Sequence, residues 1–121
     1  MGQITEKAKL NHRSGHMCSS AVLCAFADKA GLTQEEAVEM ARPFAGGRGI
    51  RCGAVLAAEK VLEHIFDEAT AAKKKEELER RFTEMNQSVI CAELKGRTGG
   101  KVLRSCPGCV EDAATILEEM V

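Results

Sequence analysis

The chain has 121 residues, 45% of them apolar and 29% charged, and this composition suits one soluble globular domain covering residues 1–121. Seventeen basic and eighteen acidic residues give a formal charge of −1, so the sequence does not favour electrostatic binding to nucleic acid. No stretch approaches the roughly 20 apolar residues that span a bilayer, and residues 1–10 lack the apolar run of a signal peptide, so we expect a cytoplasmic protein without membrane insertion.

The first 43 residues predict two or three helices. Residues 1–14 are polar with scattered apolar positions, which fits either a short helix or a loose N-terminal segment. Residues 17–30 are so apolar that they predict a central helix buried on most sides and ended by Gly31. The pattern from Thr33 to Glu36 is typical of a capping box and begins the next helix, which ends at Pro43.

The middle of the chain predicts two longer helices. A glycine-rich turn over residues 44–51 leads into Cys52, which falls at or beside the start of a helix that extends to Phe66. The charged residues 71–85 predict an amphipathic helix. The side chains of this second helix that are expected to face inward are Leu78, Phe82 and Met85.

Two further helices are predicted near the C-terminus. Ser88 is expected to cap a short helix that carries Cys91. Cys106 is expected to cap the last helix, with Pro107 at its first position and Met120 near its end. No stretch shows the strict alternation of a strand. The sequence therefore predicts an all-α fold, a compact bundle of about five or six helices.

Six cysteines are the main functional clue in the sequence. In a chain without an export signal, cysteines favour metal binding, catalysis or redox cycling over a structural disulfide framework. Cys18, Cys52, Cys91 and Cys106 each fall in the first turn of a different predicted helix, where the helix dipole favours a thiolate. We therefore expect these four cysteines to converge on one site in the folded chain. Cys24, inside the apolar helix, is interpreted as a small buried hydrophobe.

The segment Cys106-Pro107-Gly108-Cys109 has the Cys-x-x-Cys spacing of thiol–disulfide oxidoreductases. The βαβ pattern that surrounds this motif in thioredoxins is missing. Zinc fingers and zinc ribbons bring two closely spaced ligand pairs, whereas this chain has one Cys-x-x-Cys, so a structural zinc site is disfavoured. The motif therefore indicates redox chemistry more than structural metal binding.

The order of the cysteine contexts also indicates a family. These contexts are a lone Cys18 before an apolar helix, Cys52-Gly53-Ala54 after a glycine-rich turn, Cys91-Ala92-Glu93-Leu94, and a last cysteine before Val110. From about residue 10 to 120 this order resembles a protein family described as redox-active and named for the pattern Cys, Gly-Cys-Ala-x-x-Gly, Cys, Cys. The resemblance implies a small, mainly helical protein with four characteristic cysteines. They carry over as Cys18, Cys52, Cys91 and Cys106, with Cys109 as the competing choice for the last. Ala57 stands where the motif has its second glycine.

Our first hypothesis is a redox or electron-transfer protein in which Cys18, Cys52, Cys91 and Cys106 hold an iron–sulfur cluster or another thiolate-bound metal. The second is a metal-free thiol–disulfide oxidoreductase whose catalytic cysteines are Cys52, Cys106 and Cys109. The third is a helical interaction domain with inert thiols. The redox partner is not identified by the sequence, and a homodimer through the apolar side of the last helix stays open.

Overall fold

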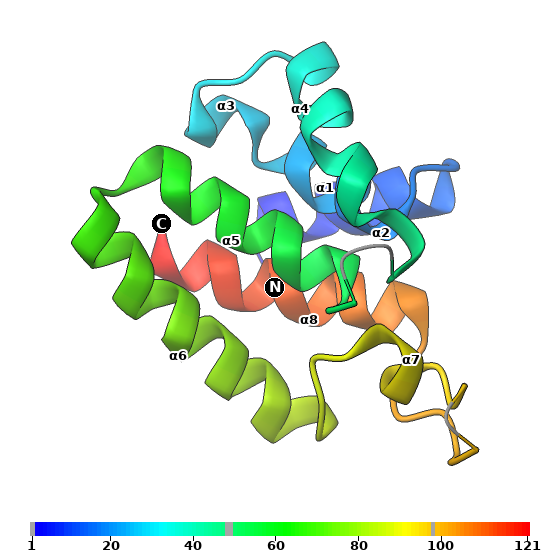
Figure 1. Ribbon diagram of the computed structural model, residues 1–121. Helices are drawn as coiled ribbons and strands as arrows, with labels where there is room; N and C mark the ends of the chain where they lie inside the picture. The colour runs from blue at the N-terminus through cyan, green and yellow to red at the C-terminus, as the bar shows by residue number, and fades with distance from the viewer. Residues whose placement is uncertain (1, 48–49, 98) are drawn as a thin grey trace.

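The computed structural model describes residues 2–47, 50–97 and 99–121. Within these ranges the chain forms eight α-helices, one 3₁₀ helix and no strand, so the predicted all-α class is confirmed (Figure 1). The elements are α1 (Gln3–Arg13), α2 (Cys18–Ala25), α3 (Ala27–Ala30), α4 (Gln34–Ala41), η1 (Arg42–Gly47, 3₁₀), α5 (Gly53–Ile65), α6 (Glu68–Asn86), α7 (Cys91–Leu94) and α8 (Cys106–Met120).

The helices outnumber the five or six that were predicted, for two reasons. The predicted helix over residues 17–30 is broken at Phe26, a buried residue with φ −97° and ψ 6° that separates α2 from α3. Residues 3–13 form a regular helix instead of a loose segment. Periodicity alone could not show the break, because the apolar pattern continues across Phe26.

Capping side chains decide where several helices begin. The predicted capping box is confirmed, since the Thr33 hydroxyl accepts from the Glu36 N–H at 3.1 Å and the Glu36 carboxylate accepts from the Thr33 N–H at 2.9 Å. Asp67 caps α6, which therefore begins three residues before the predicted Ala71. Ser105 caps α8 by accepting from the N–H of residue 108, so Cys106 is the first helical residue and the prediction of Cys106 as the cap is wrong.

One hydrophobic core joins residues of α1, α2, α5, α6 and α8. Helix α2 is buried along nearly its whole length and packs on α5 and α1, while α8 packs on α1 and α5. The largest fully buried side chains include Phe26 and Phe82, and alanines fill much of the remaining space. The prediction that Met85 faces inward is wrong, because its side chain is 54% exposed near the end of α6.

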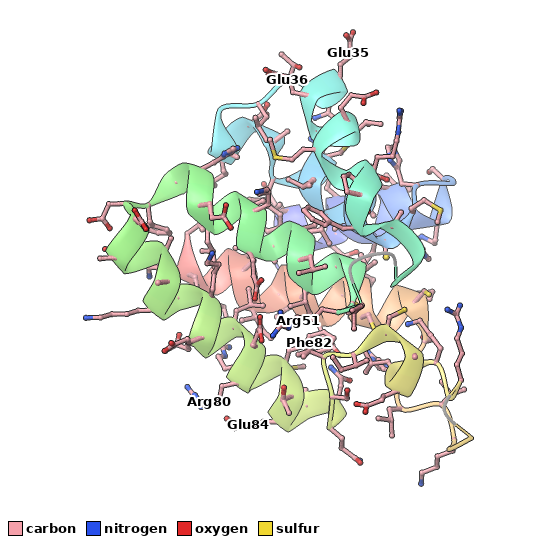
Figure 2. The ribbon with its side chains drawn as sticks, in the orientation of Figure 1. Glu35, Glu36, Arg51, Arg80, Phe82 and Glu84 are labelled. Carbon is pink, nitrogen blue, oxygen red and sulfur yellow. The ribbon has the colours of Figure 1, made fainter. Side chains whose placement is uncertain are left out.

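The charged face of α6 lies toward solvent. Figure 2 shows Arg80 and Glu84 projecting outward from this helix, where their side chains form an ion pair at 2.6 Å. Arg81 instead reaches the Glu119 carboxylate on α8. Because exposed ion pairs contribute at most about 1 kcal/mol, the buried face holds α6 in place more than these charges do.

Helices α5 and α8 run side by side and begin at the same end of the bundle, next to α7 (Figure 1). A single antiparallel bridge between Arg51 and Ile90 ties the segment before α5 to the segment before α7. The fold therefore gathers three helix starts, each carrying a cysteine, at one end. No helix in the described ranges is both long enough and apolar enough to cross a membrane.

Candidate functional site

Backbone hydrogen bonds position Cys52 and Cys91 at the start of their helices. The Cys52 N–H donates to the Val89 carbonyl at 2.7 Å, and the Cys91 N–H donates to the Ile50 carbonyl at 3.0 Å. Both cysteines are buried, with exposed fractions of 2% and 6%. Because the two segments are paired to each other, the start of α5 and the start of α7 are held in a fixed relation.

An interaction between two cysteines joins α5 to α8. Cys52 forms a side-chain hydrogen bond with Cys109, the fourth residue of α8, whose side chain is only 1% exposed. The Lys95 ammonium group, just after α7, donates to the Cys109 sulfur at 3.5 Å. Two thiols and one cation from three different helical segments therefore meet in the interior.

The pKa values of the two thiols are shifted in opposite directions by this arrangement. The hydrogen bond with Cys109 and burial both raise the pKa of Cys52, which therefore stays a thiol. The same hydrogen bond lowers the pKa of Cys109; burial opposes this shift, and the nearby Lys95 charge adds to it. Of the two, Cys109 therefore loses its proton more readily, and Cys52 is the hydrogen-bond donor to its sulfur.

The same sulfurs also shift the pKa of Lys95. Burial lowers the pKa of this lysine, but the charges of Cys109 and Cys106 outweigh burial and raise it. Its ammonium also donates to the Arg104 carbonyl at 3.4 Å, which fixes the side chain over the start of α8. The sequence analysis missed Lys95. A lysine four residues after Cys91 is an ordinary surface pattern, and it gains a role only because the chain returns to the end of α7 just before α8 begins.

Cys106 is the more accessible cysteine of the Cys-x-x-Cys motif. It is half-buried at the first position of α8, and its side chain hydrogen-bonds Lys95. Residues three apart on a helix have Cα atoms about 5 Å apart, within the range that a disulfide spans. Cys106 and Cys109 are therefore spaced for disulfide formation, as the sequence predicted for this motif.

Cys18 lies against the start of α5. It is the first residue of α2, and a Cβ atom at Gly53 would stand 2.7 Å from its sulfur. The absence of a side chain at position 53 is therefore what lets α2 approach α5 beside Cys52. Cys24 is 1% exposed inside α2, as expected for a small buried hydrophobe, and burial raises the pKa of its thiol.

The predicted metal ligands reach the same end of the bundle without forming a ligand set. Among the residues that the structure describes, no three Cys, His, Asp or Glu side chains lie together so that they could hold a metal ion. The donors in the described ranges thus do not fit an iron–sulfur cluster or a tetrahedral metal, which needs four ligands at close range. The metal centre stays a prediction.

The chain belongs to the family C_GCAxxG_C_C, whose description is "Putative redox-active protein". The family model matches residues 16–120, a range that contains all six cysteines, so the resemblance found in the sequence is confirmed. No curated protein and no solved structure gives a significant match to the chain.

Proposed function

We propose that this protein is a thiol–disulfide redox protein whose buried Cys52 and Cys109 cycle between a dithiol and a disulfide. The observation that carries the proposal is the contact between Cys52 and Cys109, with the Lys95 ammonium group 3.5 Å from the Cys109 sulfur. A thiolate is the species that attacks a disulfide sulfur, and a neighbouring thiol in direct contact is positioned to complete the exchange.

Cys106 is the residue that meets the substrate, because Cys52 and Cys109 are buried. Its thiolate attacks one sulfur of a substrate disulfide, and the other substrate sulfur leaves as a thiolate that takes a proton from solvent. The Cys109 thiolate then attacks the Cys106 sulfur and releases the second substrate thiolate. This step leaves a disulfide between Cys106 and Cys109.

Cys52 takes part in the last step of the proposed reaction. It loses its proton and attacks the Cys109 sulfur, so that Cys106 leaves as a thiolate and the disulfide now joins Cys52 to Cys109. The proton from Cys52 neutralises the second substrate thiolate. Overall, one substrate disulfide gains two electrons and two protons and becomes two thiols, while Cys52 and Cys109 are oxidised. The reverse sequence oxidises a substrate dithiol.

The experiment mixes the fully reduced protein with 2-hydroxyethyl disulfide and follows thiol release and protein mass. The wild type is expected to release two substrate thiols per chain. Cys109→Ser is expected to stop at a mixed disulfide on Cys106, and Cys106→Ser to react at least about tenfold more slowly because the buried pair is then reached only through local opening. Cys24→Ala, a matched change of a buried cysteine, is expected to react like the wild type.

Two results would overturn the proposal. One is a Cys109→Ser variant that releases two thiols as fast as the wild type, because exchange then does not pass through Cys109. The other is iron with acid-labile sulfide, or zinc, bound in stoichiometric amount to anaerobically purified protein and lost in Cys52→Ser. That second result would establish the metal-centre hypothesis instead, with Cys18, Cys52, Cys91 and Cys106 as its predicted ligands.

A further inference from the structure

Two segments that lie next to the cysteines in the sequence contain basic residues and no acidic ones. Residues 42–51 contain three arginines and residues 95–104 contain four basic residues, and neither segment contains Asp or Glu. The rest of the chain holds ten basic against eighteen acidic residues. The near-neutral formal charge therefore conceals an uneven distribution of charge along the sequence. Three of these basic residues form ion pairs: Arg42 with Glu39, Arg51 with Glu79, and Arg104 with Glu111 and Asp112.

The last residues of the second basic segment are held against the end of α7. The N–H groups of Leu103 and Arg104 both donate to the Leu94 carbonyl, at 2.9 and 3.2 Å, so the loop returns to the end of α7 before α8 begins. Arg97 and Lys101 on this loop are exposed and form no ion pair with any described residue. Their charges are thus available to a molecule that approaches Cys106.

Large exposed apolar side chains occur at the same end. Met17, Ile50 and Val102 are 53%, 70% and 60% exposed, and each lies within four residues of Cys18, Cys52 or Cys106. Ile50 also has φ +71°, a conformation that β-branched residues rarely adopt and that costs about 1–3 kcal/mol. Apolar side chains amid charged residues around a reactive group are typical of a protein-binding surface.

We propose that this cationic face, defined as residues 42–47, 50–51, 95–97 and 99–104 together with Met17, docks a protein partner whose redox-active cysteines are surrounded by acidic residues. The proposal rests on the proposed function, since Cys106 is the group that the partner must reach. A small disulfide would need only the charges next to Cys106 and would gain nothing from Ile50 or Val102. A second copy of this chain would bring like charges together across a two-fold axis, which opposes self-association through this face.

The test measures the rate constant for mixed-disulfide formation on Cys106 in the Cys109→Ser variant. The probes are two synthetic peptides, each joined through one cysteine to thionitrobenzoate, with the same apolar residues and either glutamates or lysines around that cysteine. The glutamate peptide is expected to react at least about tenfold faster at low salt, and the difference is expected to shrink as salt screens the charges. 2-Hydroxyethyl disulfide serves as the neutral reference for the reactivity of Cys106 itself.

Further substitutions, each combined with Cys109→Ser, test which residues of the cationic face contact the peptides. Arg97→Glu with Lys101→Glu is expected to abolish or reverse the preference for the glutamate peptide while leaving the neutral rate unchanged. Ile50→Ser with Val102→Ser is expected to slow both peptides about threefold or more and not 2-hydroxyethyl disulfide. Lys29→Glu with Lys73→Glu is the matched control, because both lysines are exposed on other parts of the bundle and the preference is expected to persist.

The outcomes separate the two proposals. If 2-hydroxyethyl disulfide itself fails to react, the proposed function is overturned. If it reacts but the two peptides have equal rate constants, the docking proposal alone is overturned. The docking proposal is also overturned if oxidised glutathione, a small anionic disulfide, gains as much rate as the glutamate peptide and is unaffected by Ile50→Ser with Val102→Ser, because the face then recognises small molecules.

Discussion

Lys95 gives the cysteine site its electrostatic asymmetry. It is the ammonium group that contacts the Cys109 sulfur, and it also hydrogen-bonds the more accessible Cys106. A cation at this distance stabilises a thiolate in a partly dehydrated site far more than it would in water. The deprotonation of Cys109 is therefore favoured by a residue that lies outside the Cys-x-x-Cys motif.

Replacing Lys95 with methionine is expected to raise the pKa of the Cys109 thiol, because the positive charge is lost while the apolar stem of the side chain is kept. Thiolate absorbance near 240 nm measures this pKa with little background, since the chain has neither Trp nor Tyr. Cys109→Ser assigns the titration, and Lys101→Met is the control for the loss of an exposed charge. An unchanged titration in Lys95→Met would contradict the account.

A second unusual residue is Glu59 in α5, which is only 9% exposed to solvent. Burial raises its pKa to about 9, and a hydrogen bond with Glu79 on α6 adds to the shift, while Lys75 and Arg51 act in the opposite direction. Its Oε2 atom has no hydrogen-bond partner among the described residues. At neutral pH Glu59 therefore keeps its proton, with Glu79 on α6 as its hydrogen-bond partner.

The proton held by Glu59 makes stability depend on pH. Between the ordinary carboxyl pKa and about 9, folded Glu59 holds a proton that the unfolded chain releases, so the free energy of unfolding falls as pH rises. Glu59→Gln keeps a donor for Glu79 and carries no proton to lose. It is expected to raise the free energy of unfolding by about 1–3 kcal/mol near pH 8 and much less near pH 5. Urea denaturation at the two pH values measures this.

Glu63→Gln is the matched control for that prediction. Glu63 is on the same helix but is exposed; its slight burial acts to raise the pKa of its carboxyl group, and hydrogen bonds with Lys75 and Lys60 outweigh this and lower it. Its replacement should not raise the free energy of unfolding near pH 8. Equal gains in the two variants would show that removing any negative charge stabilises the protein, and the account of a buried, protonated Glu59 would fail.

At the scale of elements, the site depends on how closely α2 approaches the start of α5. Gly53 permits this contact, because a Cβ there would stand 2.6 Å from the Phe44 carbonyl oxygen and 2.7 Å from the Cys18 sulfur. The carbonyl belongs to the backbone of η1 and cannot move aside without shifting that helix. This geometry gives a physical reason for a glycine after the cysteine in the Cys52-Gly53-Ala54 segment.

Gly53→Ala is therefore expected to lower the free energy of unfolding by about 1–3 kcal/mol through overpacking. Chemical denaturation of the reduced protein measures the change without interference from disulfides. Gly100→Ala is the control, because no atom lies within 4 Å of a Cβ at that position, and its effect should stay within about 0.5 kcal/mol. If Gly53→Ala proves as stable as the wild type, α2 and α5 do not meet as tightly as described.

Local signals predicted most of the helices and little of their contacts. The Thr33 capping box and the apolar spacing of α8 act within a few residues, so the sequence alone was sufficient for them. The cap at Ser105 was missed because Cys106 and Pro107 gave an equally plausible start one residue later. The break at Phe26 depends on packing in the core, which periodicity does not report.

At the scale of the whole molecule, the cysteines were found in the sequence but their arrangement was not. Positions in the first turn of a helix were correctly predicted for Cys18, Cys52, Cys91 and Cys106. The prediction of Ser88 as the cap of α7 is wrong, because Ile90 is the residue at that position. The contact between Cys52 and Cys109 joins residues 57 positions apart and depends on α5 and α8 beginning at the same end, which no local pattern encodes. The same reason applies to Lys95, whose partners come from another helix.

The central claim is that Cys52 and Cys109 form the stable disulfide of the oxidised protein. Trypsin releases Cys52 in peptide 52–60 and both cysteines of the Cys-x-x-Cys motif in peptide 105–121, while Cys18 and Cys91 fall in peptides 14–29 and 82–95. Mass spectrometry of mildly oxidised protein, digested without reduction, is the most direct measurement. We predict that peptide 52–60 is crosslinked to 105–121 and that the crosslink persists in Cys106→Ser. A crosslink lost in that variant, or one that joins 52–60 to 14–29 or 82–95 instead, would contradict the account.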